Sequence, residues 1–228
     1  MSKRNLILCF SSLRPHQYEE SMLIQREKNY SLSLEWLLKS LPDHWDIIYN
    51  DNTLSNLSEI KNEELRYKLT NERIRVILHQ NNEGSVNKGA GEHSMCKKSF
   101  ESIDPDNYNW ISYFTARHII PNPWYFENLD NNWKDYDSVM SNPAFFYLAN
   151  YLKSDPTPGL YNDMLFSMKS DVFKKFIDHI DVELLKRNHT NSENHLYSFF
   201  SSGEFNNLEI ENLGILRNDH QSYGWHLV

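Results

Sequence analysis

A segment with two glycines, Asn87-Lys88-Gly89-Ala90-Gly91-Glu92, has the residue types that suit an anion-binding turn. Two of the seven glycines stand two residues apart, which favours a backbone that turns tightly or approaches another group closely. An apolar, β-branched run precedes the segment, and helix-forming residues follow it. A helix start offers free N–H groups to a phosphate or other anion. A tight turn with a capped helix and no ligand explains the segment equally well.

This segment is neither of the two familiar phosphate loops. It lacks the third glycine of the dinucleotide-binding pattern, and no Gly-Lys-Ser or Gly-Lys-Thr ends it. Other polar residues with suitable chemistry follow predicted strands. They are Ser11 and Arg14 after the first, Asp51 and Asn52 after the second, and Thr115 and Arg117 after the fourth. Because ligands of open α/β sheets bind at the carboxyl ends of the strands, we expect these residues at one edge.

The elements that must position these residues alternate regularly in the first half of the chain. Buried-strand patterns cover residues 6–10, 45–49, 75–79 and 110–114, and helical patterns cover 30–41, 58–70 and 92–103. This order predicts a parallel sheet with right-handed crossovers. Beyond residue 117, prolines and aromatics interrupt the alternation. Further strands are expected at 138–140 and 164–168, helices at 171–180 and 193–200, and a loop at 155–159.

Bulk composition restricts the class of protein. A length of 228 residues predicts one domain over residues 1–228. The net charge of −8 and the scattered basic residues argue against nucleic acid as a partner. Two cysteines exclude a disulfide scaffold. Neither a membrane-length apolar run nor a signal-peptide pattern is visible, so the sequence predicts a soluble, cytoplasmic protein without an integral membrane segment.

The order of these features resembles the small sugar-nucleotide glycosyltransferases of the GT-A fold found in bacterial surface-polysaccharide clusters and some large viruses. Residues 87–92 resemble the Asn-Lys-Gly-x-Gly-Glu segment of that family, and residues 110–117 resemble its strand that ends in Thr-Gly-Arg. Residues 165–169 and 193–197 resemble the acceptor-side strand and the Glu-containing helix. The resemblance implies a single-domain, Rossmann-like α/β fold with a mixed, mostly parallel sheet. It divides the domain into a nucleotide-sugar half, 1–118, and an acceptor half, 119–228.

The resemblance also implies an activity: transfer of a hexose or deoxyhexose from a nucleotide-diphosphate donor to a saccharide or lipid-linked glycan acceptor. Donor contacts are then expected from the polar strand-end residues and from the glycine segment. The complete set is Ser11, Arg14, Asp51, Asn52, Asn87, Lys88, Gly89, Gly91, Glu92, Thr115 and Arg117. Among these, Lys88 and Arg117 are candidates to offset the diphosphate charge. For either cation, a surface salt bridge is the alternative role.

The resemblance makes Glu193 the first candidate for the general base and Asp163 the second. A carboxylate that only stabilises its helix dipole is the alternative for Glu193. Many GT-A enzymes carry Asp-x-Asp after the fourth strand to hold a divalent cation, where this chain has Thr115-Ala116-Arg117. The formal match Asp104-Pro105-Asp106 precedes that strand and is typical of a turn. We therefore predict no metal ligands, although Mn²⁺ or Mg²⁺ use is left open.

Two other classes of protein fit parts of the pattern. A noncatalytic nucleotide- or saccharide-binding protein could retain the same fold. A nucleotidyltransferase would share the α/β plan but needs a metal-binding carboxylate pair and a richer Gly/Arg loop near the first strand. Residues 11–15, Ser-Ser-Leu-Arg-Pro, do not supply that loop.

Overall fold

The computed structural model describes residues 3–80, 83–141, 161, 163–188, 192–201, 203–219 and 224–227. Side chains are described for all of these except residues 83, 217–219 and 224–227. The loop predicted at residues 155–159 lies outside the described residues.

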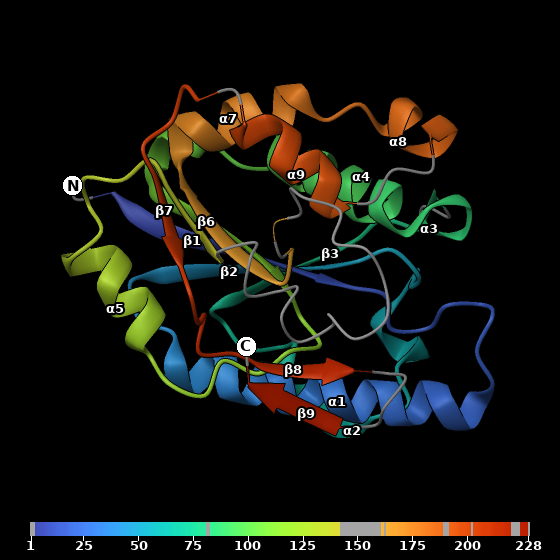
Figure 1. Ribbon diagram of the computed structural model, residues 1–228. Helices are drawn as coiled ribbons and strands as arrows, with labels where there is room; N and C mark the ends of the chain where they lie inside the picture. Colours follow the sequence, from blue (N-terminus) through green and yellow to red (C-terminus); the bar gives the residue numbers. More distant parts are fainter. Residues whose placement is uncertain are drawn as a thin grey trace.

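Seven strands form one mixed sheet in the order β3-β2-β1-β4-β6-β5-β7 (Figure 1). Their bounds are β1 Arg4–Ser11, β2 Trp45–Asp51, β3 Ile74–Leu78, β4 Tyr108–Thr115, β5 Ser138–Ser141, β6 Leu165–Lys169 and β7 Asn207–Ile210. The first four strands are parallel, β6 is antiparallel to both β4 and β5, and β7 is parallel to β5. The predicted fold class, a mixed and mostly parallel sheet flanked by helices, is confirmed. A separate pair of antiparallel strands, β8 Leu216–Asp219 and β9 Gly224–Leu227, lies near the C-terminus.

Helices cover both faces of the sheet. In Figure 1, α1 (Glu20–Ser40) and α2 (Glu63–Lys68) lie on one face, and α4 (Lys88–Glu101), α7 (Ser170–His179) and α9 (Ser192–Phe200) lie on the other. The short α3 (Glu83–Val86) and α8 (Val182–Asn188) lie beside α4, and α5 (Trp124–Asn131) lies on the side of α1. Single 3₁₀ turns occupy Leu57–Glu59 and Pro105–Asn107. Within the described residues, no helix combines the length and apolar character that crossing a membrane requires.

The alternation of side chains along β1 explains the two layers. Ile7 and Cys9 point to the face that packs against Leu34 and Leu37 of α1. Leu6, Leu8 and Phe10 point to the opposite face, whose core includes Met95, Phe173 and Phe176. A strand alternates its side chains between faces, so a strand with a continuous apolar run, such as residues 6–10 of β1, must be covered on both.

Several predicted elements have other limits in the structure. The first helix begins at Glu20, ten residues before its predicted start, and the helix predicted at 58–70 is reduced to α2 and the preceding 3₁₀ turn. The helices α5 and α8 were not predicted. Both are short, and the prolines before α5 obscured its apolar face of Tyr125, Phe126 and Leu129.

The prediction of a tight glycine turn is wrong. Asn87 caps α4, and Gly89 and Gly91 lie inside the first turns of that helix, with neither glycine at positive φ. The expectation of a close approach does hold for Gly91. A Cβ atom there would stand 2.6 Å from the Gly84 backbone, so the glycine allows α3 and α4 to touch.

Strand register brings the carboxyl ends of the parallel strands to one edge of the sheet. Ser11 pairs with Asp51, Asp51 pairs with Leu78, and Phe10 pairs with Thr115. The antiparallel strand β6 begins at this same edge, where Leu165 pairs with Phe114. This edge carries most of the residues singled out from the sequence.

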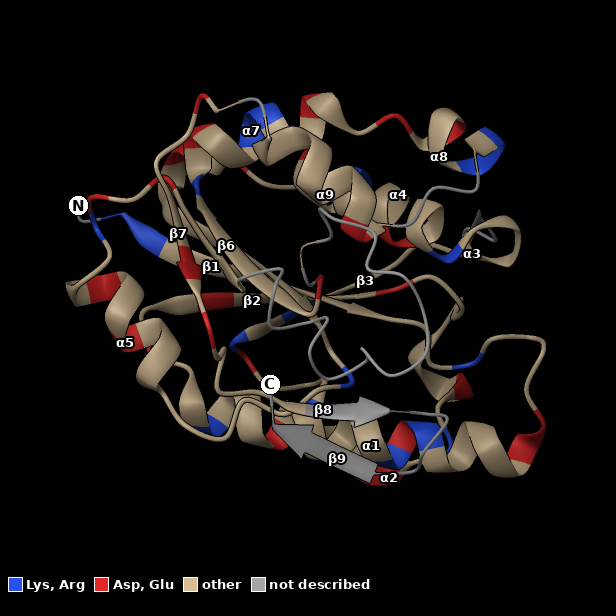
Figure 2. Ribbon diagram, in the orientation of Figure 1, with Lys and Arg blue, Asp and Glu red and all other residues tan. Residues whose placement is uncertain are grey.

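Charged residues of both signs are spread over the helices of both layers (Figure 2). In this view no helix is predominantly basic, in keeping with the scattered basic residues of the sequence.

Candidate functional site

At the ends of β1 and β2, the Asp51 carboxylate joins the loops that follow these two strands. One oxygen accepts from Ser11 Oγ at 2.6 Å and Leu13 N at 2.8 Å. The other accepts from Thr53 N and Oγ1, both at 2.7 Å, and from Leu54 N at 2.9 Å. Burial raises the pKa of Asp51, and hydrogen bonds from Ser11 and Thr53 act in the opposite direction. Asp51 is fully buried, so its contact with a nucleoside stays a prediction that requires displacing one of these donors.

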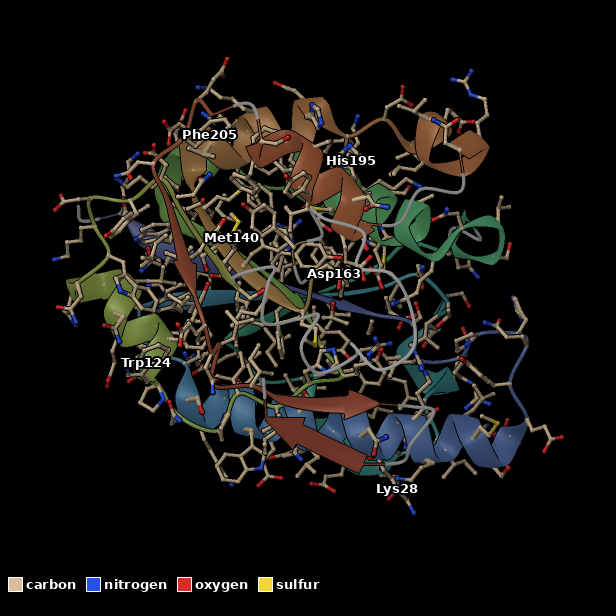
Figure 3. All side chains as sticks on the ribbon, in the orientation of Figure 1. Lys28, Trp124, Met140, Asp163, His195 and Phe205 are labelled. Carbon is tan, nitrogen blue, oxygen red and sulfur yellow. The ribbon has the colours of Figure 1, made fainter. Side chains whose placement is uncertain are left out.

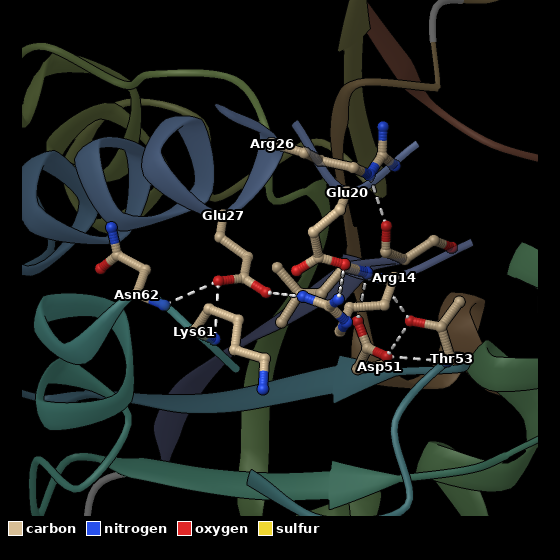
Figure 4. Close-up of polar contacts among 10 residues, drawn as sticks. Arg14, Glu20, Arg26, Glu27, Asp51, Thr53, Lys61 and Asn62 are labelled. Atoms are coloured by element: carbon tan, nitrogen blue, oxygen red, sulfur yellow. Dashed lines mark hydrogen bonds and ion pairs between the residues drawn. The ribbon is translucent and has the colours of Figure 1, made fainter. Parts of the chain in front are cut away.

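Arg14 is held by the first helix (Figure 4). Its guanidinium contacts Glu27 at 2.7 Å and Glu20 at 2.5 Å. The other Glu27 oxygen accepts from Lys61 N at 2.8 Å and Asn62 N at 2.7 Å, so this buried carboxylate is also satisfied. Arg14 thus fixes the loop after β1 to α1, and its contact with a donor stays a prediction.

Asn52 and the start of α4 adjoin each other. Asn52 Oδ1 accepts from Ser12 Oγ at 2.6 Å, and its Nδ2 lies 3.4 Å from the place of a Gly91 Cβ. Asn87 Oδ1 accepts from Ala90 N at 3.0 Å, and Asn87 Nδ2 donates to Leu185 O at 3.3 Å. Asn87 therefore serves as the helix cap, which is also the alternative that the sequence left open.

Two carboxylates converge at the start of α9. Asp163 lies just before β6, close to the beginning of α9 (Figure 3). Its Oδ2 accepts a short hydrogen bond from Ser192 Oγ, and Ser192 Oγ also lies 3.4 Å from Glu193 Oε2. Because β6 is antiparallel to β4, its beginning, rather than its end, lies at the edge where the parallel strands end, and this places Asp163 there.

Lys88 and Glu92 of α4 complete a charged group around these residues. Lys88 Nζ lies 3.5 Å from Glu92 Oε1, and Tyr113 Oη lies 3.5 Å from Glu92 Oε2. Burial raises the pKa of Glu92, and the Asp163 charge adds to this effect while Lys88 and Arg117 oppose it. The Glu92 carboxylate is the main cause of the raised pKa of Lys88.

Glu193 is the carboxylate of this group whose pKa best suits acid–base catalysis. Burial, followed by the charge of Asp163, raises its pKa to about 7, and Lys88 partly opposes the shift. A carboxylate with a pKa near the working pH suits general acid–base catalysis. The same shift is typical of residues in functional sites.

Thr115 ends β4, and Arg117 follows it two residues later. Thr115 Oγ1 donates to Asp163 O at 3.2 Å, and Thr115 N donates to Met164 O at 2.9 Å, which joins β4 to the segment before β6. Arg117 Nε is buried and, within the described residues, has no hydrogen-bond partner. A buried N–H without a partner is costly, so it marks a place where a ligand oxygen would be favourable.

We name Lys88, Glu92, Arg117, Asp163 and Glu193 the charged cluster. Its three carboxylates do not form a metal site: within the described residues, no three His, Cys, Asp or Glu side chains are arranged to share an ion. Lys88 pairs with Glu92, and Ser192 donates to Asp163. The Asp104-Pro105-Asp106 match is a 3₁₀ turn in which Asp104 accepts from Asp106 N, and Asp106 pairs with Lys174. We therefore derive no step through a bound cation.

Sequence reasoning missed several polar residues near the edge. The most important of them is Ser192, which contacts both Asp163 and Glu193. Its position immediately before Glu193 was the only feature of the sequence that pointed to it. His79 Nε2 lies 3.1 Å from Asn50 Oδ1, which also accepts from Ser99 Oγ at 2.5 Å. These three residues lie on β2, after β3 and on α4, so their contact depends on the tertiary fold.

Comparison with solved structures found relatives of the fold. A protein from Desulfovibrio desulfuricans G20 that is assigned as a nucleotide-diphospho-sugar transferase matches with a TM-score of 0.54 and 14% identity, over 92% of this chain and 80% of that one. A mannosyltransferase from Pyrobaculum calidifontis, solved with GDP-Man and Mn²⁺, matches with a TM-score of 0.61 and 10% identity, over 98% of this chain. The chain has the GT-A-like fold. It spans 59% of the length of the Pyrobaculum protein.

Sequence comparisons add no closer relative. No protein-family model matches the chain, and no curated protein matches its sequence. The fold expected from the resemblance is therefore confirmed by structure alone. The bacterial-polysaccharide or large-virus subtype, the two halves and the cytoplasmic location stay predictions.

Proposed function

We propose that the protein is a glycosyltransferase that moves a hexose or deoxyhexose from a nucleotide-diphosphate donor to a saccharide or lipid-linked glycan acceptor. The observation that carries the proposal is the charged cluster at the edge of the sheet near the end of β4 and the start of β6. It contains a carboxylate of raised pKa and a buried arginine N–H that has no hydrogen-bond partner within the described residues. That edge is where ligands bind in open α/β sheets.

The donor would bind across residues 1–118, with the nucleoside near Ser11, Asp51 and Asn52. The diphosphate would then lie between the start of α4 and Arg117. Lys88 and Arg117 stabilise the negative charge that builds up as the diphosphate leaves. The buried Arg117 Nε gains the acceptor that it lacks within the described part of the protein. This pairing would favour the donor-bound state.

The acceptor would bind on the side of residues 119–228, where Glu193 lies at the start of α9. Glu193 takes the proton from the acceptor hydroxyl while that oxygen bonds to the anomeric carbon and the nucleotide diphosphate departs. A single displacement of this kind inverts the configuration at the anomeric carbon. Asp163 is the second candidate for the base, because it lies beside Ser192 and raises the pKa of Glu193.

The first experiment is a thermal-shift screen of nucleotide sugars, with GDP-mannose included because the Pyrobaculum mannosyltransferase was solved with GDP-Man. A ligand that binds only the native state at 100 times its Kd stabilises it by about 2.7 kcal/mol. The best donor is then assayed for release of nucleotide diphosphate with glycan acceptors. Acceptor-dependent release supports the proposal. Binding without release or transfer would instead favour a noncatalytic nucleotide- or saccharide-binding protein.

The same assay in EDTA and in added Mn²⁺ or Mg²⁺ tests the proposed metal independence. Turnover should persist in EDTA if Lys88 and Arg117 neutralise the leaving group. Complete loss of turnover that manganese restores would contradict this part of the proposal.

A further inference from the structure

The hydroxyl of Ser192 lies between the two carboxylates of the acceptor side. Ser192 is the first residue of α9 and is buried. Its Oγ makes a short hydrogen bond to Asp163 Oδ2 and lies 3.4 Å from Glu193 Oε2. No other side-chain hydroxyl in the described residues contacts both groups. Ser192 thus connects a carboxylate before β6 to one on α9.

A serine hydroxyl has one hydrogen to donate. The shorter contact assigns that hydrogen to Asp163, which leaves none for Glu193. If Glu193 carries a proton, its O–H donates to Ser192 Oγ and Ser192 donates to Asp163. Each of these two contacts then has its own hydrogen. The raised pKa of Glu193, caused first by burial and then by Asp163, supports this protonated state near pH 7.

Charged groups of both signs act on Glu193. Lys88 and Glu92 of α4 affect its pKa in opposite directions. Arg117 and Lys88 both act on Glu92, which lies farther along α4. Asp163 is half-buried, so a proton that reaches it can pass to solvent, whereas the hydroxyl between the two carboxylates is buried.

We propose that Ser192 is a positioning residue that passes a proton from Glu193 to Asp163 during sugar transfer. The inference rests on the proposed function for its chemical step. Glu193 takes the proton of the acceptor hydroxyl as the new glycosidic bond forms and the bond to the diphosphate breaks. The Glu193 O–H proton then moves to Ser192 Oγ as the Ser192 proton moves to Asp163 Oδ2. Glu193 is again a carboxylate, Ser192 is unchanged, and Asp163 releases the proton to water.

The kinetic test compares Ser192→Ala, Ser192→Thr and the control Ser201→Ala, which alters an exposed serine just after the same helix. We expect Ser192→Ala to lower kcat about 10-fold or more, with the donor KM within about 2-fold of the parent value, because only the proton step is affected. The pH profile of kcat should shift as well. Ser192→Thr, which keeps the hydroxyl, should restore most of the rate. Equal rates and pH profiles for Ser192→Ala and the parent would overturn the relay.

A second measurement needs no turnover. In protein labelled with ¹³C at glutamate side-chain carboxyls, the Glu193 resonance, assigned from Glu193→Gln, is followed against pH. Ser192→Ala removes the acceptor of the Glu193 proton and a donor to Asp163, so the pKa of Glu193 should fall. An unchanged pKa of Glu193 in Ser192→Ala would overturn the proposal that protonated Glu193 donates to Ser192. A fall in the pKa of Glu193, in a protein that transfers no sugar, would support the hydrogen bond from Glu193 to Ser192 and reject the proposed function.

Discussion

Two groups of residues at the carboxyl-end edge of the sheet differ in how completely their charges are paired. At the ends of β1 and β2, Asp51 accepts hydrogen bonds from Ser11, Leu13, Thr53 and Leu54. In the charged cluster, Glu193 has a raised pKa and Arg117 Nε lacks a partner within the described residues. A paired carboxylate holds the loops in place, whereas poorly paired groups gain most from a ligand. The difference favours a structural role for Asp51 and leaves the proposed roles in catalysis and binding to Glu193 and Arg117.

The largest expected effect is on the paired side. Asp51→Ala would leave several buried donors without an acceptor, so the free energy of unfolding should fall by about 3 kcal/mol or more. Urea unfolding measures this, with Asp43→Ala as the control because Asp43 is fully exposed. A stable Asp51→Ala variant that has lost only nucleotide binding would make Asp51 a ligand contact and break the comparison.

The next effect concerns the cations of the charged cluster. The double variant Lys88→Ala/Arg117→Ala should lose about 2 to 3 kcal/mol of binding free energy for a nucleoside diphosphate, since charge-assisted contacts to phosphate are removed. Its stability should change little, because Arg117 Nε has no partner to lose within the described residues and the ion pair of Lys88 with Glu92 has an exposed cation. Calorimetric titration provides the measurement.

The control for this double variant is Lys28→Ala/Arg187→Ala, which removes the same net charge from exposed positions on α1 and α8. Unchanged affinity in Lys88→Ala/Arg117→Ala, or an equal loss in the control, would reject a diphosphate site at the cluster.

A smaller effect tests how α4 is positioned over the edge. Gly91→Ala should cost about 1 to 3 kcal/mol, because its Cβ would stand 2.6 Å from the Gly84 backbone. Gly84→Ala is the matched variant: its Cβ would make an ordinary contact, 3.5 Å from Asn52 Nδ2. Thermal unfolding of both should show a lower Tm for Gly91→Ala alone. Equal Tm values would mean that the close approach of α3 and α4 does not constrain the site.

A further effect is a pH dependence of the free energy of unfolding. The pKa of Glu193 rises from 4.5 to about 7 on folding, so the folded protein binds this proton more tightly than the unfolded chain does. The resulting destabilisation is absent below about pH 4.5 and grows as the pH rises through about 7. Glu193→Gln should therefore be more stable than the parent at about pH 8 and equal to it at about pH 4. Urea unfolding at the two pH values measures the difference. A variant that is no more stable than the parent at about pH 8 would contradict the claim that the charged form of Glu193 destabilises the folded protein.

The sequence predicted the sheet because its strands are short apolar runs that must be buried on both faces. It also placed Ser11, Asp51 and Thr115 at one edge of the sheet, because each of them ends such a run; that a ligand binds at this edge stays a prediction. It could not show which of these residues are already paired. The five donors to Asp51 come from two loops that meet only in the folded protein.

The surroundings of β6 and α9 were harder to predict. Asp163 reaches the edge because β6 is antiparallel to β4, and the apolar pattern of β6 does not encode the direction of the strand. The helical state of Gly89 and Gly91 was missed because glycine pairs are more typical of turns, while the Asn87 cap and the contact with Gly84 favour the helix here. Ser192 gave no signal apart from its neighbour Glu193.

The central claim is that Glu193 is the general base, and the rate of sugar transfer by Glu193→Gln tests it most directly. The rate is measured at saturating donor, beside the parent and the exposed control Glu204→Gln. Glutamine keeps the shape of the side chain but cannot take up the acceptor proton. The account predicts a rate lower by about 100-fold or more, with donor affinity nearly unchanged and the control as fast as the parent. A Glu193→Gln enzyme that transfers sugar at the parent rate would contradict it and move the base to Asp163.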